Sequence, residues 1–205
     1  LGEWDMARLE SALDRISGVM IHYNCENADF GLFDRQLSRI EDEFGPLLKR
    51  LKWVSLGGGI HFTGEGYPVE ALAERLRRFA DRFEVQVYLE PGEAAITGAA
   101  SLEVTVLDIL NNGKDLAIVD SSVEAHMLDL LIYRQSARME TQGDHPYMIC
   151  GKSCLAGDIF GEFTFPAPLN VGDRLSIADA AGYTMVKKNW FNGVKMPSIA
   201  VRELD

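Results

Sequence analysis

Three short apolar runs in the first half of the chain are each followed by groups that could bind a charged ligand. His22 follows the first run, Gly57-Gly58-Gly59 the second, and Glu90-Pro91-Gly92 the third. Backbone N–H groups of consecutive glycines can approach a phosphate without obstruction by side chains. The carboxylate of Glu90 could pair with a protonated pyridine nitrogen, a contact that changes the chemistry of such a ring.

Each of these groups also has a structural explanation. The triple glycine could be only a tight turn, Glu90 only a member of a salt bridge, and His22 a hydrogen-bonded core histidine. Glu90 ends an otherwise apolar strand, where an unpaired carboxylate is costly, so we expect it to have a partner. The glycines lack the G-x-G-x-x-G spacing of a dinucleotide site, which argues against a Rossmann fold.

The elements that must position these groups alternate between strands and helices. Apolar runs at 18–22, 53–56 and 85–89 predict strands, while apolar residues at helical spacing predict helices over 30–52 and from Pro68 onward. The strands recur at intervals of roughly 33 residues, the size of a βαβ unit. This rhythm predicts a parallel sheet or a piece of a (β/α)8 barrel, in which ligands bind beyond the carboxyl ends of the strands.

The second half of the chain has a different pattern. Runs at 102–109 and 115–119 are rich in β-forming residues, and Asn112-Gly113 between them is typical of a turn. We therefore predict an α/β plus all-β protein with two domains. Residues 1–97 form the α/β domain, and residues 98–205 form an antiparallel β-barrel or sheet domain.

Composition and charge narrow the function classes. The net charge of −11 argues against a nucleic-acid surface, and it suits a soluble protein with a cationic substrate. No apolar run approaches the roughly 18 residues of a membrane span, and no basic-then-apolar leader opens the chain. These features predict a cytoplasmic protein that binds neither membrane nor nucleic acid.

The chain has three cysteines, Cys25, Cys150 and Cys154. An odd number without a secretory signal predicts reduced thiols rather than a disulfide framework. The spacing of Cys150 and Cys154 could suit a metal, but no second Cys/His pair accompanies them, so we predict no metal site.

Five motifs give the chain a resemblance to a known family. They occur in the order seen in fold-type III, alanine-racemase-like decarboxylases that use pyridoxal 5′-phosphate: 22–27 (HYNCEN), 56–59 (LGGG), 90–93 (EPGE), 151–158 (GKSCLAGD) and 181–184 (AGYT). The detail of the Cys154 motif, of 119–127 and of 187–193 is most similar to the carboxynorspermidine (carboxyspermidine) decarboxylases. The resemblance implies that residues 1–97 are the C-terminal portion of a cofactor-binding (β/α)8 barrel and 98–205 the β-rich C-terminal domain.

The resemblance also implies roles for residues of the first domain. His22 would stack on the pyridine ring, and Glu90 would pair with the ring N–H, so both count as catalytic. Gly57, Gly58 and Gly59, with the backbone near Gly92, would hold the cofactor phosphate.

Further roles follow for the second domain. Tyr183 would add a hydroxyl to the phosphate site. Cys154 would enter the site of a partner subunit and protonate the carbon that has lost CO₂, which implies a homodimer with shared sites. A thiol suits such proton transfer; the alternative for Cys154 is a small buried hydrophobe.

Some positions depart from related decarboxylases. Glu93 stands where ornithine-type enzymes tend to carry an arginine, and Leu155 where diaminopimelate enzymes carry an acidic residue. Arg134 lies near the position of an acidic residue in ornithine-type enzymes. It could bind a substrate carboxylate or be a surface residue. Asp158 could meet an amine of the substrate.

We therefore predict a carboxy-lyase that converts carboxynorspermidine or carboxyspermidine to norspermidine or spermidine. The alternatives are a decarboxylase of diaminopimelate or ornithine, or a non-catalytic relative. None of the lysines, from Lys49 to Lys195, fits the family's pattern for the Schiff-base lysine. We expect that lysine to lie before residue 1 in a longer protein, and this chain alone to be inactive.

Overall fold

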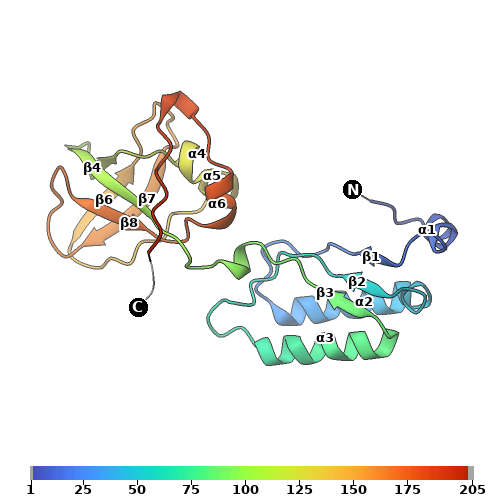
Figure 1. The fold of residues 1–205 in the computed structure, drawn as a ribbon. Coiled ribbons are helices and arrows are strands. Elements are labelled where there is room, and N and C mark those ends of the chain that lie inside the picture. Colours follow the sequence, from blue (N-terminus) through green and yellow to red (C-terminus); the bar gives the residue numbers. More distant parts are fainter. Residues whose placement is uncertain (1, 203–205) are drawn as a thin grey trace. The chain divides into compact units, whose positions relative to one another are not determined.

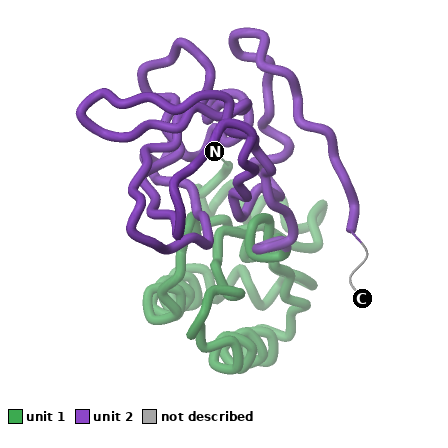
Figure 2. Tube along the Cα trace, turned by 90° about the vertical axis from the view of Figure 1, so that its left-hand side faces the viewer, with its two compact units in different colours: residues 1–95 green, residues 96–205 purple. Residues whose placement is uncertain are grey.

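A computed structural model describes residues 2–202 of the chain. The chain forms two compact units, Leu1–Ala95 and Ile96–Asp205 (Figure 2). Each unit has its own core of buried apolar side chains.

The first unit contains a small parallel sheet with two long helices on one side of it (Figure 1). The strands lie in the order β1-β2-β3, with Val19 opposite Val54 and Val54 opposite Val87. Its elements are α1 (Met6–Ala12), β1 (Gly18–Met20), α2 (Phe30–Leu48), β2 (Trp53–Ser55), α3 (Val69–Phe83), β3 (Gln86–Tyr88) and the 3-10 turn η1 (Glu93–Ala95).

The core of the first unit lies where α2 and α3 pack on the sheet. The apolar stripes expected from helical spacing face this core, which confirms the α/β reading of the first half. The fully or nearly buried side chains include Phe33, Leu37, Leu48, Val54, Leu56, Leu72 and Phe79. Two boundaries differ from the expectation. The helix α2 ends at Leu48, with Pro46 inside its last turn, and Pro68 precedes α3 as its N-cap residue.

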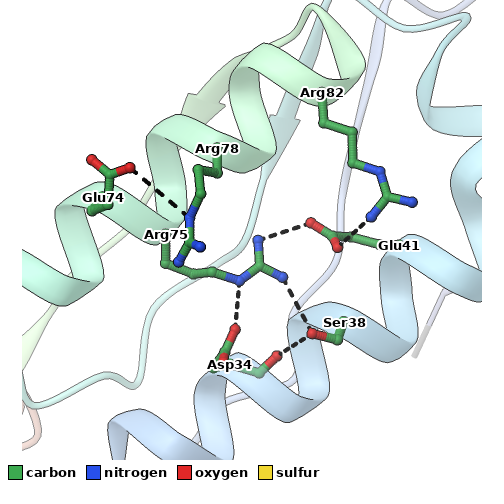
Figure 3. Close-up of polar contacts among 7 residues, drawn as sticks. All are labelled: Asp34, Ser38, Glu41, Glu74, Arg75, Arg78 and Arg82. Carbon is green, nitrogen blue, oxygen red and sulfur yellow. Dashed lines mark hydrogen bonds and ion pairs between the residues drawn. The ribbon is translucent and has the colours of Figure 1, made fainter.

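A buried ion-pair cluster joins the polar edges of α2 and α3 (Figure 3). Arg75 of α3 is 7% exposed; its Nε lies 2.5 Å from Asp34 Oδ1, and its Nη1 lies 2.8 Å from Glu41 Oε1. Glu41 is 8% exposed, and its other oxygen lies 2.8 Å from Arg82 Nη1. Ser38 Oγ accepts a further hydrogen bond from Arg75. A buried charge is tolerated when it is paired in this way.

The substitution Arg75→Leu is expected to lower the free energy of unfolding by about 3 kcal/mol, because Glu41 would stay buried with only Arg82 as partner. Urea unfolding followed by far-ultraviolet circular dichroism measures this change, since α2 and α3 are the longest helices described. The control is Arg77→Leu, at a side chain that is 70% exposed, for which we expect a change within about 0.5 kcal/mol. Equal effects of the two substitutions on the free energy of unfolding would contradict a stabilising role for the buried pair of Arg75 and Glu41.

The second unit is a mixed sheet with short helices (Figure 1). The strands lie in the order β7-β6-β5-β4-β8. Its elements are β4 (Leu102–Asn111), β5 (Asp115–Val119), α4 (Val123–His126), α5 (Leu128–Tyr133), β6 (His145–Cys150), β7 (Ile159–Phe165), β8 (Arg174–Ile177), α6 (Gly182–Val186) and the 3-10 turn η2 (Phe191–Gly193).

The expectation of a β-rich second half is confirmed, with one difference in strand direction. The pairs β4–β5, β4–β8 and β6–β7 are antiparallel, as predicted, and Gly113 turns the β4–β5 hairpin with a φ of 74°. The pair β5–β6 is parallel. The chain passes through α4 and α5 between these strands, and such a crossover is what allows parallel pairing.

The core of the second unit is formed by inward-facing residues of all five strands. Alternate side chains of β4 are buried, as expected for a strand with one face on a core. The most buried members are Val104, Val106, Ala117, Val119, Ile149, Phe160 and Ile177. Within residues 2–202, no helix is long and apolar enough to cross a membrane.

Candidate functional site

In the first unit, the loops after β1, β2 and β3 meet around the triple glycine. A Cβ atom at Gly57 would collide with His22 Nδ1, and one at Gly58 with the carbonyl oxygen of Glu90. A Cβ atom at Gly59 would collide with the carbonyl oxygen of Asn24. Gly57 and Gly59 also have positive φ, 69° and 78°. Glycine is therefore required both for the turn and for the close approach of the neighbouring strand ends.

His22 and Glu90 both lie on the surface at this edge of the sheet. The side chain of His22 is exposed, so it is not part of the core of the first unit. Glu90 is also exposed, so the burial assumed for it was wrong, although the expected partner is found in Ser55. Both side chains can reach a ligand that binds beyond the carboxyl ends of the strands.

Ser55 connects Glu90 to the glycine loop. Ser55 is 3% exposed; its Oγ donates a hydrogen bond to Glu90 Oε1 at 2.5 Å and accepts one from Gly57 N at 3.2 Å. Within residues 2–202, the Glu90 carboxylate is thus held by a hydroxyl rather than by the salt bridge considered as an alternative. Sequence reasoning missed Ser55, although a serine that ends an apolar strand just before a glycine turn was visible.

The backbone N–H groups of the loop differ in their availability. That of Gly57 donates to Ser55, so it is already engaged. Among the hydrogen bonds of residues 2–202, no acceptor is found for the N–H groups of Gly58, Gly59 or Gly92. These three groups, rather than that of Gly57, are suited to bind an anion.

In the second unit, Cys154 lies in the loop between β6 and β7 and is exposed. Cys154 is therefore not part of the core of the second unit. Asn192, which sequence reasoning also missed, donates a hydrogen bond from Nδ2 to Cys154 Sγ at 3.0 Å. Burial raises the pKa of the nearby Cys150 thiol, and the charge of Asp158 raises it further, so Cys150 is held in its protonated, unreactive form.

Asp158 is a structural member of the same loop. It is 4% exposed, and its carboxylate accepts hydrogen bonds from Val123 N at 2.6 Å, Ser153 N at 3.0 Å and Ser153 Oγ at 2.5 Å. The described hydrogen bonds use both carboxylate oxygens of Asp158 to fix the loop. A contact between Asp158 and a substrate stays a prediction. A hollow of about 380 Å³ lies beside it, lined by residues that include Lys114, Cys150 and Leu155.

The remaining predicted residues lie on the surface of their own units. Tyr183 is 52% exposed on α6, where Lys187 Nζ lies 4.8 Å from the centre of its ring. Arg134 is exposed at the C-terminal end of α5, in the left-handed conformation with φ 54°. Gly92 is exposed directly before η1. The roles of these three residues stay predictions.

Comparison with known families decides what these two units belong to. Residues 30–181 match the family described as "Pyridoxal-dependent decarboxylase, C-terminal sheet domain". The chain belongs to this decarboxylase family. The match runs from α2 to the residue before α6. It therefore includes the glycine loop, Glu90 and the Cys154 loop of this chain.

Two relatives among the pyridoxal-dependent decarboxylases are similar to this chain over most of its length. The chain is 64% identical over 206 residues to the carboxynorspermidine/carboxyspermidine decarboxylase of Herminiimonas arsenicoxydans, a match that covers 100% of this chain and 56% of the relative. It is 38% identical to the carboxyaminopropylagmatine decarboxylase of a Synechocystis strain, over 90% of this chain and 49% of that protein.

A solved structure agrees in fold. The crystal structure of carboxynorspermidine decarboxylase from Campylobacter jejuni, complexed with norspermidine, has a TM-score of 0.83 and 37% identity, over 90% of this chain and 55% of that chain. The chain therefore spans about half the length of the relatives that it matches.

Proposed function

We propose that the protein containing this chain decarboxylates carboxynorspermidine or carboxyspermidine, which yields norspermidine or spermidine in polyamine biosynthesis. The observation that carries this proposal is the 64% identity, over the whole chain, to an enzyme named for these substrates. The exposed Cys154, His22 and Glu90 support catalysis rather than a non-catalytic role, because each remains accessible to a ligand.

Pyridoxal 5′-phosphate is the proposed cofactor, and the residues of the first unit fit it. The N–H groups of Gly58, Gly59 and Gly92 would bind its phosphate, where no Cβ atom obstructs the glycine loop. His22 would orient the ring by stacking, and Glu90, held by Ser55, would keep the ring nitrogen protonated. When bound, the cofactor supplies a ring that accepts the electron pair left by departing CO₂.

The second unit would supply the groups that meet the substrate. Cys154 would give its proton to the carbon that has lost CO₂. Tyr183 would donate a hydrogen bond to the phosphate, and Arg134 would bind a substrate carboxylate. In the proposed homodimer Cys154 acts on the cofactor held by the other subunit. The proposed domains are residues 1–97 and 98–205, and the proposed location is the cytoplasm.

The alternative substrates can be weighed against the proposed ones from single residues and from the relatives. Leu155 and Arg134 offer no acidic group to a distal amine, which disfavours diaminopimelate and ornithine. A guanidine-bearing substrate is the second candidate, because the Synechocystis relative is named for carboxyaminopropylagmatine. A non-catalytic relative would release CO₂ from none of them.

The test is CO₂ release by the full-length protein with pyridoxal phosphate and each of five substrates. These are carboxynorspermidine, carboxyspermidine, carboxyaminopropylagmatine, diaminopimelate and ornithine. We expect release from the first two at the highest kcat/KM. Faster release from any of the other three would replace the proposed substrate, and release from none would support the non-catalytic alternative.

A further inference from the structure

The contact between Asn192 and Cys154 joins two segments that lie far apart in the sequence. Asn192 Nδ2 donates to Cys154 Sγ at 3.0 Å, across 38 positions of the chain. Asn192 has a φ of 51° and a ψ of 25°, in the left-handed region. Residues other than glycine rarely adopt this region, and asparagine is among those that tolerate it best. The backbone of η2 therefore adopts an uncommon conformation where its amide side chain meets the thiol.

The Cys154 loop is attached to the N-terminal end of α4. Asp158 Oδ1 accepts a hydrogen bond from Val123 N at 2.6 Å, and Lys152 N donates to Ser121 O at 2.9 Å. Asp158 and Ser121 are both buried, so water does not compete strongly for these bonds. The position of the Cys154 backbone is thereby fixed relative to α4.

The Asn192 segment is attached to the same helix. Asn189 N donates to Ala125 O at 2.9 Å, and Asn189 Nδ2 donates to Glu124 O at 3.0 Å. The side-chain oxygen of Asn189 then accepts a hydrogen bond from Phe191 N at 2.7 Å, which shapes the turn that carries Asn192. Because α4 anchors both segments, the amide of Asn192 and the thiol of Cys154 are presented to each other by the same short helix.

We propose that Asn192 is a positioning residue for Cys154 in the decarboxylation. The inference rests on the proposed role of Cys154 as proton donor. In that step the S–H bond breaks, a C–H bond forms at the carbon that has lost CO₂, and sulfur keeps the electron pair. The N–H of Asn192 holds Sγ in one orientation and stabilises the negative charge that develops on it.

The reactivity of the thiol tests this role without turnover. The thiolate is the form that reacts with iodoacetamide, and a donated N–H stabilises the thiolate. In the full-length protein, Asn192→Asp and Asn192→Gly are expected to slow alkylation of Cys154 at neutral pH by about three- to tenfold. The aspartate keeps the shape of the side chain, removes the donor and adds a negative charge that itself disfavours the thiolate. Glycine keeps the left-handed backbone and removes the donor without adding charge, so it is the deciding variant.

Peptide mass spectrometry gives the rate at each cysteine, so the exposed Cys25 is a control within the same molecule. The proposal requires slower alkylation at Cys154 with an unchanged rate at Cys25. Unchanged alkylation of Cys154 in Asn192→Gly would overturn it, as would an equal slowing at Cys25. Failure of the proton-donor role is a separate result, because it appears as full product formation by Cys154→Ala and does not depend on Asn192.

Discussion

The substitution Cys154→Ala in the full-length protein is expected to lower product formation by about 10²–10⁴-fold, the usual contribution of a positioned general acid. Alanine removes the proton while leaving the loop intact, because the loop is fixed by Asp158 rather than by the thiol. The measurement is kcat for norspermidine or spermidine formation at saturating cofactor and substrate.

Two other cysteines serve as controls for this substitution. Cys25 is exposed in the first unit, and Cys25→Ala is expected to leave kcat unchanged within about twofold. Cys150 is partly buried near the same loop, and Cys150→Ala tests whether a change in packing alone lowers the rate. Retention of near-normal product formation by Cys154→Ala would remove Cys154 from the proposed chemistry.

The substitution Glu90→Gln is expected to lower kcat by about 10²–10³-fold, similar to the removal of a single electrostatic contact in an active site. Glutamine keeps the size of the side chain and can still accept the hydrogen bond from Ser55, so the loop geometry should persist. It loses the negative charge that would keep the cofactor ring nitrogen protonated. The measurement compares kcat with the amount of bound cofactor, found by absorbance.

The matched control for Glu90 is Glu65→Gln, which removes the same charge at another exposed position of the first unit. It is expected to leave kcat unchanged within about twofold. A loss of cofactor from Glu90→Gln in proportion to the loss of rate would point to a role in binding. An unchanged kcat would contradict the proposed pairing with the ring.

The parts of the fold that follow local rules could be predicted from sequence. Helical spacing around Phe33 and Leu37 located α2, and the apolar run around Val54 located the central strand. The parallel β5–β6 pair could not be predicted, since it depends on the path of α4 and α5 rather than on either strand. Nor could the burial of Arg75, which requires Asp34 and Glu41 on another helix.

Some residues of the candidate site could likewise be predicted from the sequence, and others could not. Residue type and motif identified His22, Glu90 and Cys154. Ser55 and Asn192 were missed because their roles arise from contacts with residues 35 and 38 positions away. No pattern within a short window distinguishes such a serine or asparagine from those that only cap turns.

Whether Glu90 and Cys154 serve one decarboxylation site shared by two subunits is tested most directly by mixing two inactive variants. Differently tagged Glu90→Gln and Cys154→Ala subunits are co-expressed, and the dimers that carry both tags are isolated. If each site takes Glu90 from one subunit and Cys154 from the other, each mixed dimer has one site with both residues intact. Its activity should then be about half that of the wild-type dimer. Activity no higher than that of the two variants alone would contradict the proposed shared site.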